Sequence, residues 1–228
     1  MKDFNTYILE KLKLSKNSTS KGEFVDLGLP SGTLWSKYNL GVEPDELDKQ
    51  QGVYELKHNW YGGYYSWGET EPKKSGDKTS EQNYKFYRGN DGDPDDMTKY
   101  NNEDGLKSLE LEDDAANVEN KHYMIPSPHD FDELFEHTEH SVSEYNYADV
   151  KMLSGMIFKS KVNDNEIFIP FTAYFDNSGG RLYEGYYWTS DCKNAQIARA
   201  WKIRDNANPI LVNTSKWSAF TIRYIKKK

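Results

Sequence analysis

The sequence has few of the residues that small domains use for covalent or metal cross-links. Its 228 residues include one cysteine, Cys192, which excludes an internal disulfide and a Cys-x-x-C metal or redox motif. Residues 1–20 contain no long apolar run, so we expect neither a Sec signal peptide nor a membrane span there. These absences predict a protein that is made in a cytoplasm and folds without disulfides.

Positive charge is also scarce. The chain has 29 Lys+Arg against 37 Asp+Glu, a formal net charge of −8. Nucleic-acid recognition needs clustered Lys and Arg, so we expect neither a nucleic-acid nor a membrane partner. The imbalance is local, because residues 90–120 hold 11 acidic and 2 basic residues, which leaves a charge of +1 for the rest.

Aliphatic side chains are few, but aromatic ones are not. Hydrophobic residues make up only 36% of the chain, yet it contains 6 Trp, 17 Tyr and 10 Phe. Each buried ring removes roughly 150–250 Å² from water, enough together to organise a core. Disordered chains are poor in aromatics, so the composition predicts one folded domain.

The N-terminus has the pattern of a short amphipathic helix. Phe4, Tyr7, Ile8 and Leu12 are spaced three and four apart, and the polar residues 17–22 follow as a linker. A helix of this length is marginal alone. It packs either on its own domain or on a partner, and the linker favours residues 1–16 as a docking helix.

The rest of the chain, residues 23–228, has the pattern of short strands joined by turns, with an acidic insertion at 70–120. Ser127, Pro128 and Asp130 predict a capped helix that buries Phe131 and Leu134. A second short helix is predicted at 109–118. Strands are expected at 24–29, 33–40, 63–67, 156–162, 166–171, 186–190, 197–203, 210–212 and 219–225.

Five motifs occur in order along the chain. They are residues 25–35 (VDLGLPSGTLW), 65–73 (YSWGETEPK), 112–116 (EDDAA), 125–127 (IPS) and 187–190 (YWTS). As a set they resemble the Fibrobacter succinogenes major paralogous domain, a family of Bacteroidetes and their phages. That family is similar to C-type-lectin-like and formylglycine-generating-enzyme folds. The resemblance implies an α+β, C-type-lectin-like fold with short twisted antiparallel strands, one or two helices and long loops.

The N-terminal segment YILEKLKL, residues 7–14, resembles a leader of crAss-like phage proteins. Together the two resemblances imply a structural or decoration protein of a Bacteroidetes phage virion, in the head, capsid or tail fibre. Residues 1–16 would dock on other virion proteins, and the domain would bind a host glycan or surface protein. We expect a homo-oligomer. The alternative is a carbohydrate-binding or adhesin domain of the bacterial surface.

No catalytic residue is assigned, and no cofactor is expected. Cys192 stands alone, whereas formylglycine-generating chemistry needs reactive cysteines, so we interpret it as an inert buried side chain. His137 and His140 lie three apart without an H-E-x-x-H motif, which favours a solvated helix face over a metal site. These patterns predict a non-enzymatic protein.

Two features are left as candidate binding sites. Residues 91–96 place carboxylates at alternating positions, as calcium loops do, but Asp96 and Asn102 stand where an EF-hand has Gly and Glu. A solvated acidic loop is therefore favoured, and no metal ligand is assigned. Tyr183, Tyr186 and Trp217 lie in turn-rich segments, where they either stack on a ligand or pack in the core.

Overall fold

The computed structural model describes residues 24–43, 60–89, 93, 95–147, 150–172, 184–205 and 207–228. These residues form mainly antiparallel sheets with few helices, so the α+β prediction is confirmed at that level. The predicted helix at 1–16 lies outside them. The elements are β1 (Phe24–Asp26), β2 (Leu34–Asn39), β3 (Tyr65–Ser66), the 3-10 helix η2 (Glu81–Asn83), α3 (Ala115–Glu119), α4 (Pro128–His137), β4 (Thr138–Tyr147), β5 (Val150–Ser160), β6 (Glu166–Pro170), β7 (Glu184–Cys192), β8 (Ile197–Arg204), β9 (Ala207–Ser215), β10 (Ala219–Phe220) and β11 (Arg223–Lys226).

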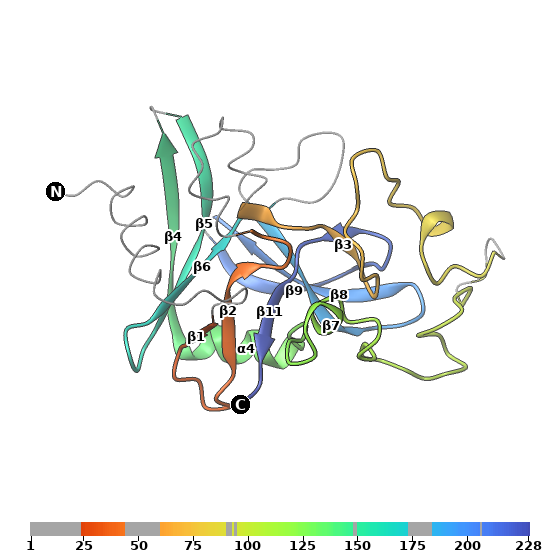
Figure 1. The fold of residues 1–228 in the computed structure, drawn as a ribbon, viewed down its shortest axis with the longest axis horizontal. Helices are drawn as coiled ribbons and strands as arrows, with labels where there is room; N and C mark the ends of the chain where they lie inside the picture. The colour runs from red at the N-terminus through yellow and green to blue at the C-terminus, as the bar shows by residue number, and fades with distance from the viewer. Residues whose placement is uncertain are drawn as a thin grey trace.

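The first and last strands of this region belong to one sheet, in which β2 lies between β1 and β11 (Figure 1). Asp26 pairs with Leu34, and Leu34 pairs on its other side with Lys226. An ion pair of 2.8 Å joins the Lys228 ammonium to the Asp26 carboxylate. Both ends of the described domain therefore lie at one sheet.

Helix α4 begins as the sequence predicts. The Ser127 hydroxyl accepts a bond from the Asp130 amide, and the Asp130 carboxylate accepts one from the Ser127 amide. This confirms the capping box, which satisfies amides that a helix start leaves free. Phe131 and Leu134 are buried, and α4 packs against β4, β5, β7 and β8.

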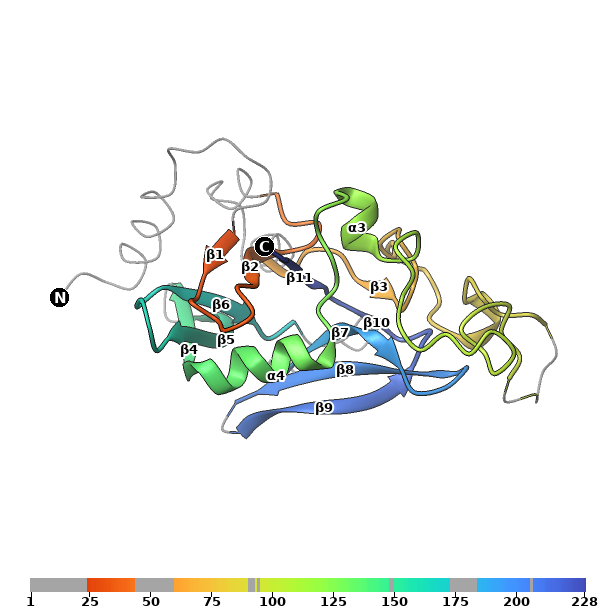
Figure 2. The same cartoon turned by 90° about the horizontal axis from the view of Figure 1, so that it is seen from below.

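Strand β8 lies between β7 and β9 in a separate sheet. Figure 2 shows β9 along the margin of the molecule opposite β1 and the C-terminus, with α4 between them. Strand β9 has no fully buried residue, whereas β7 buries most of its residues and β8 buries half. The sheet therefore presents β9 as its outer strand.

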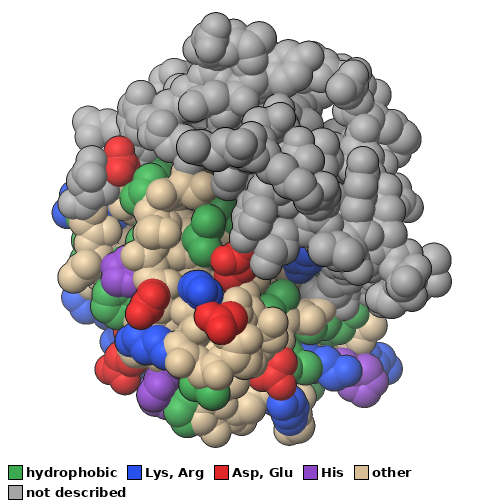
Figure 3. All heavy atoms as spheres, turned by 90° about the vertical axis from the view of Figure 1, so that its left-hand side faces the viewer, with side chains coloured by type: hydrophobic (Ala, Val, Ile, Leu, Met, Phe, Trp, Pro, Cys, Tyr) green, Lys and Arg blue, Asp and Glu red, His purple; other side chains and the backbone are tan. Residues whose placement is uncertain are grey.

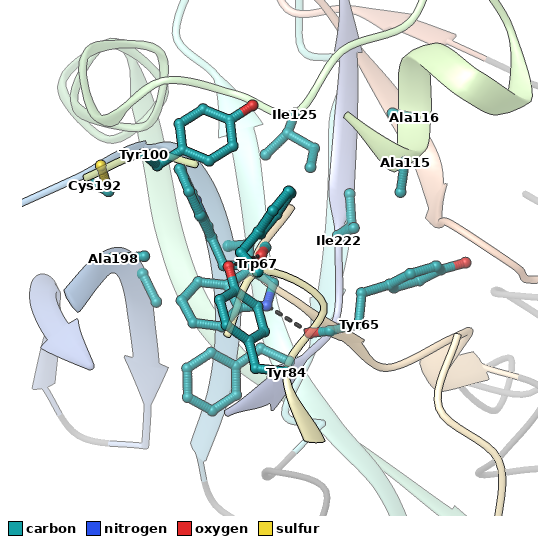
Figure 4. Close-up of a cluster of buried hydrophobic side chains, with 14 of the residues drawn as sticks. Tyr65, Trp67, Tyr84, Tyr100, Ala115, Ala116, Ile125, Cys192, Ala198 and Ile222 are labelled. Atoms are coloured by element: carbon teal, nitrogen blue, oxygen red, sulfur yellow. Dashed lines mark hydrogen bonds between the residues drawn. The ribbon is translucent and has the colours of Figure 1, made fainter. Parts of the chain in front are cut away.

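The apolar side chains form two clusters. The Phe131 cluster fills the space between α4 and the strands β2, β5, β6 and β8, and includes Trp35, Phe158 and Trp201. The Trp188 cluster lies between β7, β8 and β10 and the loops around residues 84–125, and includes Trp67 and Tyr100 (Figure 4). Both clusters are rich in rings, as the composition predicts.

Two of the sequence motifs meet in the Trp188 cluster. The Trp67 indole donates to the Thr189 carbonyl at 2.9 Å, and the Trp188 indole donates to the Tyr65 carbonyl at 2.6 Å. Gly68 has a φ of +77°, and a Cβ there would lie 2.9 Å from the Phe86 ring. Both the positive φ and the lack of space for a Cβ atom require glycine at position 68 of the motif. Both tryptophans are buried core residues.

Prediction and structure differ at three elements. The helix expected at 109–118 is the shorter α3, because the Asp114 side chain caps it by accepting from the amides of Ala116 and Asn117. The strand expected at 219–225 is divided into β10, which pairs with β3, and β11, which pairs with β2. Strand β4 was not predicted. In the described part of the chain, no helix is long and apolar enough to cross a membrane.

Candidate functional site

The residues predicted to dock on a partner, Phe4, Tyr7, Ile8 and Leu12, lie outside the described part of the chain, as does the predicted ligand residue Tyr183. The structure therefore brings together only Tyr186 and Trp217 of the predicted ligand site. Both pack as half-buried side chains against the Trp188 cluster.

Tyr186 lies on β7 with its ring and hydroxyl both engaged. The ring stacks on Phe220, with centroids 4.9 Å apart and an angle of 21°, and the Lys202 ammonium lies 4.9 Å from its centroid. Its hydroxyl donates to Glu184 at 3.1 Å. A ring with these contacts is part of the sheet's packing, and only its remaining exposed edge is available to a ligand.

Lys202 and Glu184 close this end of the β7–β8 pair. Their ammonium and carboxylate lie 2.6 Å apart, and both side chains are largely covered. Burial opposes the charge on Lys202, but the bonds to Glu184 and Tyr186 outweigh it and raise the Lys202 pKa. The pair is charged and internally neutralised, so it has no free charge with which to hold an ionic substrate.

Trp217 lies in the turn between β9 and β10, and its carbonyl accepts a bond of 3.3 Å from the Ser66 hydroxyl. This contact fixes the turn against β3. The partial exposure of Trp217 is compatible with the predicted ligand role, and its packing on the cluster is compatible with the core role. The structure keeps both interpretations open.

Among the described residues of the acidic insertion, one group of carboxylates is close enough to hold a cation: Glu110, Glu112 and Asp113. The Lys99 ammonium lies among them, at 2.6 Å from Glu110, 2.8 Å from Glu112 and 2.5 Å from Asp113. Lysine thus supplies the positive charge that a metal would bring. We name these four residues the Lys99 cluster.

Asp113 is the buried member of the Lys99 cluster. Burial opposes its ionisation, but hydrogen bonds from Lys85, Lys99 and Tyr100 outweigh that effect and lower its pKa. Lys99 has a raised pKa: burial disfavours its charge, but its bonds to the three carboxylates prevail. These charges fix the loop to α3, since Asp114 next in sequence is the α3 cap.

The carboxylates at 93–96 that the structure describes bind backbone amides. Asp93 accepts from the Asp95 amide at 2.9 Å, and Asp95 accepts from the Asn102 amide at the same distance. Asp96 is buried and accepts from the Gly89 amide at 3.2 Å. Such bonds are typical of acidic side chains that shape loops. Residues 91, 92 and 94 of the predicted calcium loop lie outside the description.

Sequence reasoning missed Lys216, which is fully buried beside Tyr100. Its ammonium donates to the Tyr100 carbonyl at 3.0 Å and lies 4.8 Å from the Trp67 ring centroid. Burial lowers the pKa of Lys216 to about 8. Tyr100 itself has a φ of +60°, which is costly for a tyrosine and is held by these contacts. Neither residue belongs to a pattern that sequence alone distinguishes.

Cys192 and the histidines show no arrangement for catalysis in the part of the chain that the structure describes. Cys192 is buried, and burial raises the pKa of its thiol, as expected of an inert side chain. His137 ends α4, but His140 lies in β4, where its ring is 4.6 Å from the Phe135 ring. The prediction that they share a helix face is therefore wrong, because α4 ends between them.

The described surface mixes charges of both signs. In Figure 3 acidic, basic and apolar side chains alternate on the face drawn, below the atoms that are not described. A scan of protein-family models and searches of curated proteins and of solved structures found no match to this chain.

Proposed function

We propose that this chain is a non-enzymatic structural or decoration protein of a phage particle, with a C-type-lectin-like domain displayed for adhesion. Residues 1–16 dock on another virion protein, and residues 23–228 face outward. The observation that carries the proposal is the position of the domain's ends: β1 and β11 flank β2, and Lys228 pairs with Asp26. If residues 1–16 attach the domain next to that sheet, the opposite side of the domain is left free to contact a ligand.

The half-buried rings support a binding role. The Lys202–Glu184 pair satisfies its own charge, and Tyr186 and Trp217 lie half-buried at the margin of an aromatic cluster. Half-buried rings on a rigid sheet can stack on a sugar or anchor a protein contact. These features suit recognition better than proton or group transfer.

Deletion of residues 2–16 tests the docking step. The shortened chain should fold, by near-ultraviolet circular dichroism and melting temperature, but should no longer join particles that lack the wild-type protein. The double variant Tyr7→Asp, Leu12→Asp should also be excluded, because it charges the apolar stripe. The matched control Glu10→Ala, Lys13→Ala changes the other face of the helix and should be incorporated. Normal incorporation of the deletion variant would refute docking through this segment.

A glycan array with the full chain tests the display step. Sugar binding that is lost in Trp217→Ala, with the near-ultraviolet spectrum retained, would assign recognition to this margin of the domain. Tyr186→Phe is the control, because it keeps the ring that stacks on Phe220 and removes only the hydroxyl group, which bonds to Glu184 and Lys202. If the array is silent, the domain is a structural decoration or binds a protein. Sugar binding by a chain that never joins particles would favour the bacterial adhesin.

A further inference from the structure

Sheet edges are the backbone surfaces most prone to pair with another chain, and this protein covers several of them. The edge of β1 is covered by Asn163 and Asn165, whose amides donate to the Asp26 carbonyl at 2.9 and 2.8 Å. The edge of β11 is paired through Met124 and Ile225, which exchange two backbone bonds of 3.0 and 2.9 Å. These contacts occupy the Asp26 carbonyl on the edge of β1 and the Ile225 backbone on the edge of β11.

In the other two three-stranded sheets, the outer strands β7 and β4 are protected in different ways. On β7, the Trp188 amide donates to the Thr221 carbonyl and the Ser190 amide donates to the Pro126 carbonyl. Strand β4 is an outer strand, and it carries the exposed charge of Glu139. Charge on an edge strand opposes its pairing with another strand.

Strand β9 has neither kind of protection over residues 210–214. In the described part of the chain it pairs with β8 alone, and its nine residues, ANPILVNTS, contain no charge. Ile210 and Leu211 are 43% and 42% exposed, and because neighbouring residues point to opposite faces, both faces are open there. Pro209 and the irregular pairing near Arg204 interrupt only the start of the strand.

We propose that residues 210–214 of β9 pair antiparallel with the same residues of a second copy, which makes the protein a symmetric dimer. A twofold axis at Val212 places Ile210 opposite Thr214 and Leu211 opposite Asn213 of the other copy. A second copy suits this edge because a strand without charge meets no like charge when it pairs with itself. The basic residues paired with this segment, Arg199 and Lys202, are the partners of Asn213 and Ile210 on β8, so β9 separates both from the interface.

The dimer is weak and reversible, because five paired residues per chain form a small interface. Since β9 lies opposite β1 and the C-terminus (Figure 2), the ends of the two domains face away from each other. Such a dimer can bridge two attachment points. The inference does not depend on the proposed virion role, because it concerns the free protein in solution.

Sedimentation velocity of the full chain over a concentration series tests the dimer. The wild type should shift reversibly from monomer to dimer mass. Leu211→Lys should remain monomeric, because the two introduced ammonium groups would lie diagonally across the paired strands on one face and repel each other. The matched control Val142→Lys alters an apolar residue that is 38% exposed on the other outer strand, and it should dimerise like the wild type.

Hydrogen exchange gives a readout that needs no variant. Backbone amides within 210–214 should exchange several-fold more slowly at dimer-forming concentrations, while those of β4 should not change. The proposal would be overturned if the wild type stays monomeric or if Leu211→Lys still dimerises. It would also be overturned if Leu211→Lys and Val142→Lys lose dimerisation equally. A monomer that instead binds an uncharged extended peptide along β9 would also overturn it, in favour of a peptide partner. None of these outcomes affects the particle-incorporation experiment.

Discussion

The two apolar clusters are built from different kinds of chain. Helix α4 and the strands β2, β5, β6 and β8 enclose the Phe131 cluster, so its backbone groups bond within regular elements. The Trp188 cluster is enclosed on one side by the loops around residues 84–125, where strands are lacking in the described chain. There, side chains such as Asp104 and Asp114 accept the bonds of backbone amides. The same burial of rings is thus supported by secondary structure in one cluster and by polar side chains in the other.

Because regular elements enclose the Phe131 cluster, we expect loss of apolar volume to lower the free energy of unfolding most in that cluster. Phe131→Ala should lower the free energy of unfolding by about 3–5 kcal/mol, because it removes a ring stacked on Trp201 at 4.9 Å. Urea unfolding at low and high salt should give the same loss. Val162→Ala is the control, since Val162 is 73% exposed and should cost little. A strongly salt-dependent loss for Phe131→Ala would contradict the comparison.

In the Trp188 cluster the largest pH effect should come from Lys216. Its folded pKa of about 8 is below the ordinary value of 10.5, so protonation destabilises the folded state at low pH. Between pH 8 and 10.5 the unfolded chain binds a proton that the folded protein does not, so stability rises with pH. Relative to Lys216→Met, the wild type should gain roughly 3 kcal/mol over that interval. Urea unfolding at pH 7.5 and 10.5 measures this gain.

A constant difference between wild type and Lys216→Met across those pH values would show that Lys216 is not held in a low-dielectric site. Phe131→Ala serves as the control for general alkaline effects, because its difference from the wild type should not change with pH. Lys216 would then contribute no electrostatic effect to the Trp188 cluster. The loops around residues 84–125 would be supported by their other hydrogen bonds alone.

Asp113→Asn should have a smaller effect, whose pH dependence has the same sign as that of Lys216 but lies in the acidic range. At pH 7 it should cost about 2 kcal/mol, because it weakens bonds from Lys85, Lys99 and Tyr100 to a buried carboxylate. The lowered pKa of Asp113 means that this stability is present above the unfolded value of about 3.9 and is lost as pH falls through the folded value.

Thermal unfolding of Asp113→Asn and wild type at pH 7 and pH 3 measures that loss, and the difference between the two should be smaller at pH 3 than at pH 7. Glu112→Gln is the control: its side chain is 75% exposed and should contribute little. An Asp113→Asn cost that is equal at both pH values would contradict a role for its charge.

The difference between the two clusters also explains how much of each could be predicted from the sequence. Helix α4 could be predicted, cap included, because Ser127, Pro128 and Asp130 are adjacent and act locally. Strand β4 could not, because its start, TEHSVSE, lacks alternating apolar residues and is stabilised by pairing with β5. The Lys99 cluster could not be predicted either, since Lys99 meets carboxylates 11 to 14 residues away through a loop of irregular backbone.

The N-terminal caps of helices α3 and α4 offer a local test. Ser127→Ala should cost about 1 kcal/mol, because it removes the hydroxyl that accepts from the Asp130 amide. Asp114→Ala should cost more, since the Asp114 carboxylate accepts from Ala116, Asn117 and Ile125, a residue outside α3. Urea unfolding of both variants measures the two costs. Equal costs would indicate that the link from α3 to Ile125 adds no stability.

The smallest effect concerns calcium. Millimolar calcium should leave the melting temperature of the wild type unchanged, because the Lys99 ammonium already lies between Glu110, Glu112 and Asp113. In Lys99→Ala these carboxylates lose their counter-charge, so the variant should melt lower without calcium and partly recover with it. Adding Glu112→Gln to Lys99→Ala removes one ligand and should weaken the recovery. A rise in the wild type's melting temperature with calcium would instead mean that an ion competes with lysine, and that charge in this loop is regulated from outside the chain.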